Sequence, residues 1–376
     1  MATIRPPRPS HRRATSALAL VLGLFLFVGC GSGGQGSTAA PATTAPGTTA
    51  AAATASADRT VVDMTGRSVR IPAQVTRVAT GFAALNATML VLGAADRLVA
   101  TSSGVSPLYP TLVPTYKDVA LVFDSGVTTV NKEALLAARP QVILLFVGAK
   151  ALLPTFDQLG IPTVVFASFQ TPAQIKQGVS LVADVLGGEA PARAKKFGEY
   201  YDGNIARVEK RTAGLTGTQI TDVYYTSGSP TKTEAKNSIV ELWLTQAGGR
   251  NLAAAHGINT APAVATVGLE DVVGWDPKVI ISKDAATDKQ IRTDPKWSGV
   301  AAVRTGRTYV NPTGVYVWSV RSAESALQPL WAAKTLHPEL FGDVDMAKEV
   351  RYFYSTFYSY QLSDAQVRAI LNPTAA

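Results

Sequence analysis

The chain of 376 residues is 47% hydrophobic and 16% charged, which excludes a disordered chain and allows two domains of ordinary size. One cysteine excludes a disulfide scaffold and any cysteine-based zinc or iron–sulfur site, and three histidines leave little for a His-rich metal site. The formal net charge is +8, but four positive charges are arginines in residues 1–29, so the remainder carries +4. This moderate charge, with no basic run interleaved with aromatic residues, predicts that nucleic acid is not a partner.

The first segment of the chain is typical of a targeting signal. Four arginines precede an apolar stretch, Ala17–Val28, that is too short to span a bilayer comfortably, and Gly29 and the single cysteine, Cys30, follow it. This arrangement resembles a bacterial lipoprotein signal, which implies that residues 1–29 are removed and that Cys30 is lipidated; the alternative is an uncleaved anchor. Residues 30–57 are uncharged and rich in Ala, Thr and Gly, which predicts a flexible tether. We therefore expect a protein held by lipid alone on the outer face of the cytoplasmic membrane.

From Asp58 onwards the pattern changes to alternating strands and helices. A short hairpin is expected first, with Val61–Asp63 and Ser68–Ile71 on either side of a Thr65-Gly66 turn. Apolar strands and helical stretches then follow one another, with strands at Arg77–Thr80, Leu98–Thr101, Gln141–Val147 and Thr163–Phe166 and helices at Ala83–Leu92 and Leu152–Leu159. This βαβ order predicts a parallel sheet that helices cover on both faces.

The middle of the chain is predicted to be helical. A capping box at Thr171, with proline at the next position, opens a helix that should end before Gly187-Gly188. A second helix with many Lys and Arg residues should follow over about 191–212. Together they predict a helical connector, residues 170–214, between two β-rich halves.

The second half returns to alternating strands and helices and ends in three helices. Strands are expected at Thr221–Tyr225, Val279–Ser282 and Thr308–Val310, and a capping box at Ser238 opens a helix that should end at Gly248-Gly249. The closing helices are expected at Ser322–Leu336, Val344–Tyr358 and Ser363–Leu371.

Two segments, one in each half, align without gaps. They are Thr129-Val130-Asn131-Lys132-Glu133 and Thr266-Val267-Gly268-Leu269-Glu270, and in each a proline follows the glutamate by seven residues and precedes an apolar strand. The spacing indicates that the halves are two copies of one βα architecture. A glutamate in the first turn of a helix also stabilises the helix dipole, which is the alternative role for each. Their matched positions favour a shared role at the surface.

These features together resemble the substrate-binding proteins of ABC importers in the iron(III)-siderophore and cobalamin class. The resemblance rests on the lipoprotein signal, the two βα halves, the connector, the paired glutamate motifs and two closing segments, Glu324–Phe341 and Phe353–Leu362. It implies an α/β fold with two Rossmann-like lobes, residues 58–169 and 215–371. A long rigid helix, residues 170–214, would join the lobes, and the ligand cleft would lie between them.

The resemblance also implies partners. Glu133 and Glu270 stand in the paired motifs and would dock on arginine clusters of the ABC permease dimer, which its ATPase drives. We expect a monomer without a cofactor, whose other partner is a small molecule.

Ligands of open α/β sheets bind beyond the carboxyl ends of the strands, so the loops that follow strands should carry the ligand contacts. The loop Asn311–Arg321 is the richest of these, because an arginine and two aromatic residues lie within six positions. The candidate ligand-binding residues are Arg321, Trp318, Tyr316, Tyr225, Tyr109 and Phe82. The alternative for Arg321 is a surface ion pair with Glu324, and the alternative for the aromatic residues is the hydrophobic core.

An anionic metal chelate needs both an arginine and aromatic surfaces, so an iron(III)-siderophore complex is the ligand that we expect. A bare divalent metal is not expected, because only His256 and His337 remain after the signal. Cobalamin, haem and molybdate or tungstate are alternatives, the oxoanions because Thr226–Lys232 is rich in hydroxyl groups and backbone donors. An enzyme is not expected, since G-x-S-x-G, H-E-x-x-H and G-K-[ST] motifs are missing from the sequence. A surface ligand sensor without transport is a further alternative.

Overall fold

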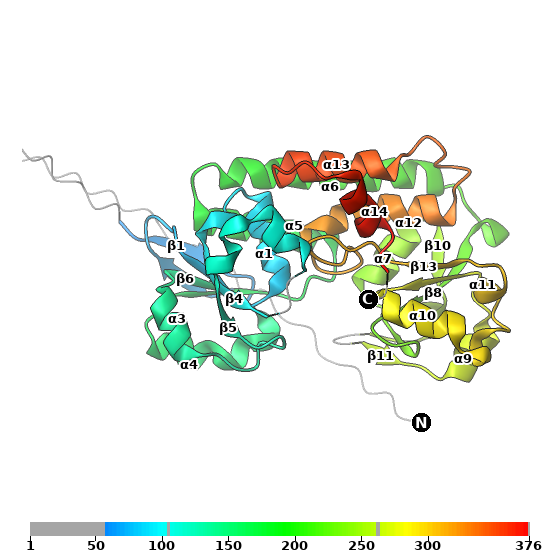
Figure 1. Cartoon of the computed structure of the whole chain (residues 1–376), viewed down its shortest axis with the longest axis horizontal. Helices are drawn as coiled ribbons and strands as arrows, with labels where there is room; N and C mark the ends of the chain where they lie inside the picture. The colour runs from blue at the N-terminus through cyan, green and yellow to red at the C-terminus, as the bar shows by residue number, and fades with distance from the viewer. Residues whose placement is uncertain (1–56, 104–105, 261–263, 375–376) are drawn as a thin grey trace, which may run out of the picture. The chain divides into compact units, whose positions relative to one another are not determined.

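The computed structural model describes residues 57–103, 106–260 and 264–374. The predicted signal at 1–29, Cys30 and nearly all of the predicted tether lie outside the described residues. Within the described chain two parallel sheets form two lobes, and helices flank each sheet (Figure 1). The predicted α/β fold with two Rossmann-like lobes is therefore confirmed.

The first lobe is built on a five-stranded parallel sheet with the order β5-β4-β3-β6-β7. Its strands are β3 (Val78–Thr80), β4 (Leu98–Ser102), β5 (Ala120–Phe123), β6 (Val142–Phe146) and β7 (Thr163–Phe166). An antiparallel hairpin precedes the sheet, formed by β1 (Arg59–Val62) and β2 (Ser68–Ile71). The sequence patterns predict all of these strands except β5, which lies at the edge of the sheet with Leu121 exposed.

Helices cover both faces of this sheet. They are α1 (Ala83–Val91), α3 (Lys132–Ala138), α4 (Leu153–Gln158) and α5 (Pro172–Leu186). Leu144 of β6 lies in the large core with residues of α1 and α5, whereas its neighbour Ile143 lies in a smaller core with residues of α3 and α4. Successive side chains of a strand point to opposite faces. The apolar run of β6 is thus explained by burial on both sides.

The second lobe is built on a four-stranded parallel sheet with the order β10-β8-β12-β13. Its strands are β8 (Thr221–Thr226), β10 (Gly249–Asn251), β12 (Val279–Ser282) and β13 (Thr308–Val310), and a small antiparallel pair is formed by β9 (Lys232–Thr233) and β11 (Ala265–Thr266). Tyr225 of β8 lies in the large core, which continues from the first lobe, together with Trp243. Tyr224 points to the other face, where it lies in a smaller core with Trp297.

The helices around the second sheet are α7 (Ile239–Gln246), α9 (Leu269–Trp275), α10 (Ala285–Thr293) and α12 (Gln328–Leu336). Shorter helices are α2 (Leu108–Leu112), α8 (Leu252–Ala255) and α11 (Ala301–Arg304), with 3₁₀ turns at Ala95–Arg97, Pro114–Asp118, Val147–Leu152, Gly217–Gln219, Pro295–Trp297 and Ala323–Leu327.

The middle of the chain forms two helices, α5 and α6 (Ala190–Thr212), rather than one long helix. Thr171 caps α5, since its side chain accepts the N–H of Gln174 at 3.1 Å. Gly187 and Gly188 separate the helices with φ of +66° and +61°, in the left-handed region that glycine adopts without strain. α6 packs against α1 and α5 of the first lobe and against α7 and α12 of the second. It therefore contacts both lobes, as does the 3₁₀ turn Ala323–Leu327, which packs against α1, α5 and α12.

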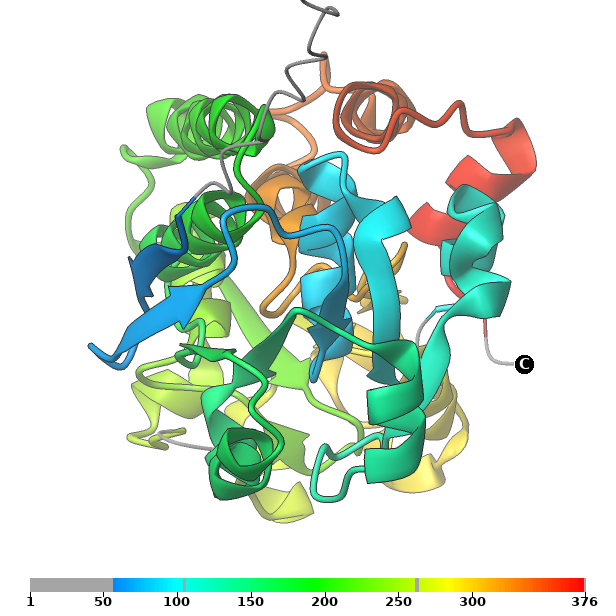
Figure 2. The ribbon, with the colours of Figure 1, turned by 90° about the vertical axis from the view of Figure 1, so that its left-hand side faces the viewer.

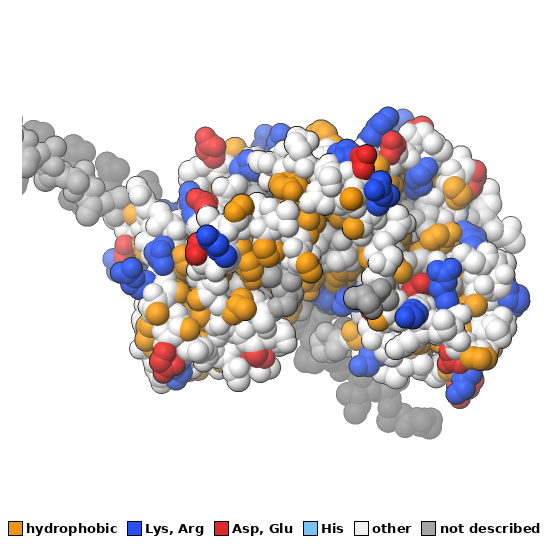
Figure 3. Space-filling model, viewed as in Figure 1, with side chains coloured by type: hydrophobic (Ala, Val, Ile, Leu, Met, Phe, Trp, Pro, Cys, Tyr) orange, Lys and Arg blue, Asp and Glu red, His pale blue; other side chains and the backbone are white. Residues whose placement is uncertain are grey.

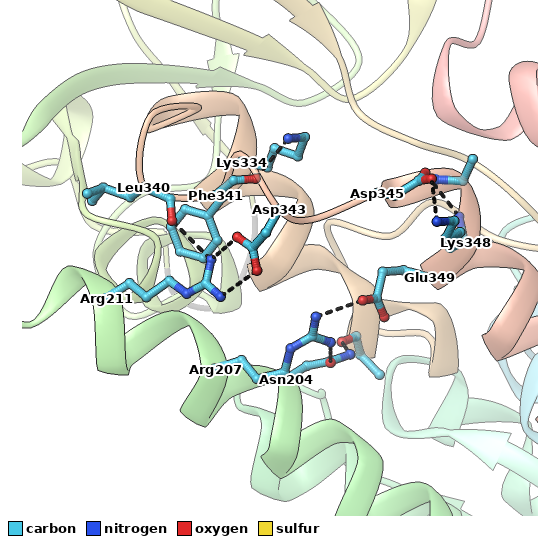
Figure 4. Close-up of polar contacts among 12 residues, drawn as sticks. Asn204, Arg207, Arg211, Lys334, Leu340, Phe341, Asp343, Asp345, Lys348 and Glu349 are labelled. Carbon is cyan, nitrogen blue, oxygen red and sulfur yellow. Dashed lines mark hydrogen bonds and ion pairs between the residues drawn. The ribbon is translucent and has the colours of Figure 1, made fainter.

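Polar contacts hold the C-terminal half of α6 to the segment that follows α12 (Figure 4). Arg211 Nη1 and Nη2 donate to the two carboxylate oxygens of Asp343, at 2.6 and 2.9 Å. Arg207 Nη2 donates to Glu349 Oε1 of α13 (Met346–Phe357) at 2.7 Å. The first pair is bidentate, which fixes its geometry more firmly than a single contact would.

The N-terminal half of α6 is attached in a similar way. Arg193 donates through Nε to the carbonyl of Val91 in the first lobe at 2.8 Å, and through Nη2 to the carbonyl of Phe357 at 2.9 Å. Helices α6 and α13 run side by side (Figures 1 and 2), and the rings of Tyr200 and Phe353 lie 5.8 Å apart. These contacts at both ends of α6 support the expectation that the connector bends little.

The C-terminal region differs in one respect from its predicted helices. The stretch expected as one helix at Ser322–Leu336 begins with the 3₁₀ turn Ala323–Leu327, and α12 starts only at Gln328. Pro329 lies in the first turn of α12, where its missing N–H costs nothing. The last helix, α14 (Asp364–Leu371), starts at a capping box formed by Ser363 and Gln366, as predicted. Among the described residues, we find no helix with the length and apolarity that a membrane crossing requires.

Basic and acidic side chains are interspersed on the face shown in Figure 3, and hydrophobic side chains gather mainly over the first lobe. Exposed ion pairs such as Lys195 with Glu199, at 3.7 Å, contribute little to stability because water screens them.

Candidate ligand-binding site

The carboxyl ends of the two parallel sheets carry the loops in which ligand contacts are expected. In the first lobe, Phe82 follows β3 within two residues. In the second lobe, the loop 311–321 follows β13 directly. The start of this loop is fixed, since Asn311 N–H donates to the carbonyl of Ser282, at the end of β12, at 2.8 Å.

Aromatic rings from both lobes meet beside these strand ends. Phe82 stacks on Phe146, the last residue of β6, with ring centroids 4.9 Å apart. Tyr316 of the second lobe approaches Phe82 in an edge-on arrangement, with centroids 6.0 Å apart. All three side chains are partly buried. They form an apolar surface to which both lobes contribute.

A buried carboxylate sets the conformation of the loop 311–321. Glu324 is completely buried and accepts hydrogen bonds from Val315 N–H at 3.2 Å, from Tyr316 N–H at 2.8 Å and from the hydroxyl of Tyr354. Burial raises the pKa of Glu324 to about 7, although these hydrogen bonds act in the opposite direction. The side chain therefore holds the backbone of the loop that presents Tyr316.

Arg321, at the end of this loop, is held in a backbone conformation that residues other than glycine rarely adopt, with φ of +53°. Its Nη2 atom lies 3.4 Å from Oε2 of Glu234, and the arginine side chain is 22% exposed whereas that of the glutamate is 1% exposed. The surface ion pair with Glu324 that the sequence allows is not formed, because Glu324 is turned inward. Burial raises the pKa of Tyr316, and the positive charge of Arg321 acts in the opposite direction.

Two of the predicted ligand contacts lie in the hydrophobic core. Tyr225 is completely buried and its hydroxyl shares a hydrogen bond of 2.9 Å with that of Ser319, while its ring packs edge-on against Trp243. Burial raises the pKa of Tyr225 well above its ordinary value, so the hydroxyl stays protonated. Trp318 is also completely buried, and its Nε1 atom finds no partner among the described residues. Both side chains therefore anchor the loop 311–321 in the core and are not free to contact a ligand at the surface.

Tyr109 lies elsewhere, in the core of the first lobe. It is completely buried and packs edge-on against Tyr116, with ring centroids 5.0 Å apart. The structure thus brings Phe82, Tyr316 and Arg321 together and adds two neighbours that the sequence patterns do not single out, Phe146 and Glu234. Glu234 lies 87 residues from Arg321 in sequence and follows a strand of two residues, so no local pattern marks it.

The paired glutamates occupy matched positions in the two lobes. Glu133 and Glu270 are both exposed, and each is the second residue of a seven-residue helix, α3 or α9. Each helix ends at a residue in the left-handed conformation, Arg139 or Asp276, with φ of +46° in both cases. A proline and a buried strand follow in both lobes. The sequence repeat is therefore also a repeat of backbone conformation.

A metal site built from the protein alone is not seen in the described part of the chain, where no three His, Cys, Asp or Glu side chains come together. The chemistry offered beside the aromatic surface is instead a guanidinium group with a buried carboxylate next to it. A guanidinium binds carboxylate, phosphate or other oxyanions through paired N–H donors.

Comparison with known proteins gives a consistent picture. The family model of periplasmic binding proteins matches residues 78–313. The chain is 27% identical over 339 residues to the molybdate-binding protein MolA of Haemophilus influenzae, a match that covers 82% of this chain and 93% of that protein.

Solved structures share the fold. A periplasmic solute binding protein of Veillonella parvula has a TM-score of 0.72 and 25% identity, covering 84% of this chain and 97% of that one. MolA of Haemophilus influenzae bound to molybdate has a TM-score of 0.73 and 24% identity, covering 81% and 99%. CeuE of Helicobacter pylori with Ni(II) bound has a TM-score of 0.66 and 18% identity, covering 83% and 99%.

Proposed function

Since the chain belongs to the periplasmic binding protein family and is the substrate-binding protein of an ABC importer, not an enzyme, we propose that it captures an anionic metal chelate outside the cytoplasm. The observation that carries this proposal is that one loop carries both Arg321 and Tyr316, whose ring joins an aromatic surface made by both lobes. A chelate with an anionic edge and an apolar organic part matches both features, because the guanidinium binds the charge and the rings bury the apolar part.

An iron(III)-siderophore complex is the chelate class that we favour, with cobalamin and haem as related alternatives. Molybdate or tungstate is the second candidate, and the specific observation in its favour is the 27% identity to a protein named as molybdate-binding. An oxoanion would use Arg321 but would gain nothing from the rings of Phe82, Phe146 and Tyr316, since it has no apolar surface to bury.

Arg321→Ala should weaken ligand binding by about 1.5–3 kcal/mol, the range for a hydrogen bond to a charged group. Isothermal titration calorimetry with whichever member of a panel of ferric chelates, cobalamin, haem, molybdate and tungstate binds the wild type measures the change. Arg304→Ala, which removes an exposed arginine of the same lobe, serves as the control and should leave the affinity unchanged. Equal affinities of the wild type and Arg321→Ala would remove Arg321 from the site.

We propose in addition that Glu133 and Glu270 dock on two equivalent basic patches of the permease dimer. The support is their exposure and their matched helix positions in two lobes that α6 connects. Each exposed ion pair contributes only about 0–1 kcal/mol, but once one contact forms, the second becomes nearly intramolecular.

Replacing one of the two glutamates by alanine should therefore reduce uptake partly, and the double substitution should reduce it severely. Ligand affinity and melting temperature should stay close to wild type, because both side chains are exposed. Uptake by the reconstituted permease is the measurement, with Glu199→Ala on α6 as an exposed control. Normal uptake by the double variant would leave both residues with a role in the helix dipole alone.

We further propose a lipid anchor at Cys30. This residue lies outside the described residues, so the proposal rests on the sequence pattern alone. Cys30→Ser should release the protein from the membrane fraction, because two or three acyl chains contribute about 0.8 kcal/mol for each buried CH₂ group. Fractionation of cells that express each form gives the answer. A Cys30→Ser protein that keeps a cleaved signal and still sediments fully with membranes would contradict the anchor.

A further inference from the structure

Glu234 is the one carboxylate in contact with the guanidinium of Arg321 among the described residues. Only one of its two carboxylate oxygens takes part in this contact. Its Oε2 atom lies 3.4 Å from Arg321 Nη2. Its Oε1 atom is buried and has no hydrogen-bond partner among the described residues. A buried carboxylate oxygen without a donor is costly, because it has lost its water and gained nothing in return.

The backbone around Glu234 is fixed by hydrogen bonds, and the side chain is only 1% exposed, so surrounding atoms limit its movement. The carbonyl of Glu234 accepts a hydrogen bond from Asn251 Nδ2 at 3.0 Å. The next residue, Ala235, donates its N–H to the hydroxyl of Thr260. The preceding strand β9 is paired with β11. The carboxylate is thus held beside Arg321.

This arrangement constrains the ligand. A fully deprotonated oxoanion bound to Arg321 would lie close to the negative charge of Glu234. It would also lack an O–H group that could donate a hydrogen bond to Oε1. A ligand that carries an anionic oxygen next to an O–H or N–H group would satisfy the guanidinium with the first and Oε1 with the second. The difference between the two kinds of ligand is largest where the site is buried, because water cannot then supply the missing donor.

We propose that Glu234 selects ligands that present a hydrogen-bond donor beside the anionic group bound by Arg321. Two sources offer this chemistry, a protonated tetrahedral oxyanion and an anionic metal chelate with free hydroxyl or amide groups. Molybdate and tungstate, which are fully deprotonated at neutral pH, do not offer it. The inference rests on the proposed function, in that it takes Arg321 as the anion contact.

The test measures affinity by calorimetry at pH 7.5 for wild type, Glu234→Gln and Arg321→Ala. The probes are molybdate and tungstate as anions without a donor, hydrogenphosphate and hydrogenarsenate as protonated anions of similar shape, and a ferric tricatecholate that carries amide groups as an anionic chelate. Glu199→Gln, the same substitution at an exposed position of α6, is the control.

We expect wild type to bind at least one donor-bearing probe about 10-fold or more tighter than molybdate, the scale of one hydrogen bond to a charged group. Glu234→Gln should weaken the donor-bearing probe and strengthen molybdate, because the amide removes the charge and adds a donor. Tighter binding of molybdate than of every donor-bearing probe by wild type, or an affinity ratio unchanged in Glu234→Gln, would overturn the role of Glu234. An affinity in Arg321→Ala equal to that of wild type would instead overturn the proposed site, whichever ligand is bound.

Discussion

Raising the pH from about 4.5 to about 7 should lower the free energy of unfolding by about 3 kcal/mol through Glu324 alone. The ordinary pKa of this carboxyl is 4.5, and burial raises it to about 7 in the folded protein. Between these values the folded state keeps a proton that the unfolded state has lost, so stability falls as pH rises. The stabilisation is complete below about 4.5 and has disappeared above about 7, with about 1.4 kcal/mol lost per pH unit.

Urea unfolding of wild type and Glu324→Gln at several pH values between 4 and 8 measures this effect. Glutamine does not titrate, so the difference between the two pH profiles isolates Glu324 from all other ionisable groups that the proteins share. We expect the wild-type curve to fall relative to the variant over the stated window. Parallel curves would mean that folding does not raise the pKa of Glu324, because the N–H groups of Val315 and Tyr316 and the hydroxyl of Tyr354 stabilise its charge.

Gly314→Ala should lower the free energy of unfolding by about 3 kcal/mol or more, at the upper end of the range for overpacking. A Cβ atom at this position would overlap the hydroxyl of Tyr354 and the carboxylate of Glu324. Both side chains are completely buried and hydrogen-bonded to each other, so neither can move aside cheaply. The glycine is therefore required by close approach to the carboxylate that holds the ligand loop.

Gly203→Ala on α6 is the matched control for this substitution. No atom lies within 4 Å of a Cβ added there, and the residue is exposed in a helix, so alanine should raise stability by about 0.5–1 kcal/mol. Thermal and chemical unfolding of both variants give the comparison. Equal stabilities of Gly314→Ala and wild type would show that Tyr354 and Glu324 can move aside at little cost, contrary to this argument.

The fold of this protein could be predicted from the sequence where the signal is local. The β6 run, the cap at Thr171 and the break at Gly187-Gly188 each depend on residues that are neighbours in sequence. The repeat around Glu133 and Glu270 predicted equivalent halves, and the two helices indeed end in the same left-handed conformation. The edge strand β5 gave no comparable signal, because an edge strand needs less apolar surface than a central one.

The candidate site was harder to predict, because its contacts join residues far apart in sequence. Arg321 and Glu324 are three residues apart, which favours a surface pair on a helix, yet the chain forms a 3₁₀ turn there and Glu324 points into the core. The actual partner of Arg321, Glu234, comes from another element. Tyr109 and Tyr225 both fill the core, and the hydroxyl of Tyr225 finds a partner there in Ser319, a placement that no local pattern reveals.

The most direct test of the proposed function is a crystal structure of the protein loaded with the ligand that native mass spectrometry identifies from the panel of chelates and oxoanions. We expect the anionic oxygen of the ligand within hydrogen-bond distance of the Arg321 guanidinium, and its apolar part against the rings of Phe82 and Tyr316, between the carboxyl ends of the two sheets. A ligand bound away from Arg321, for example in the groove between α6 and α13 that Tyr200 and Tyr352 line, would contradict this site.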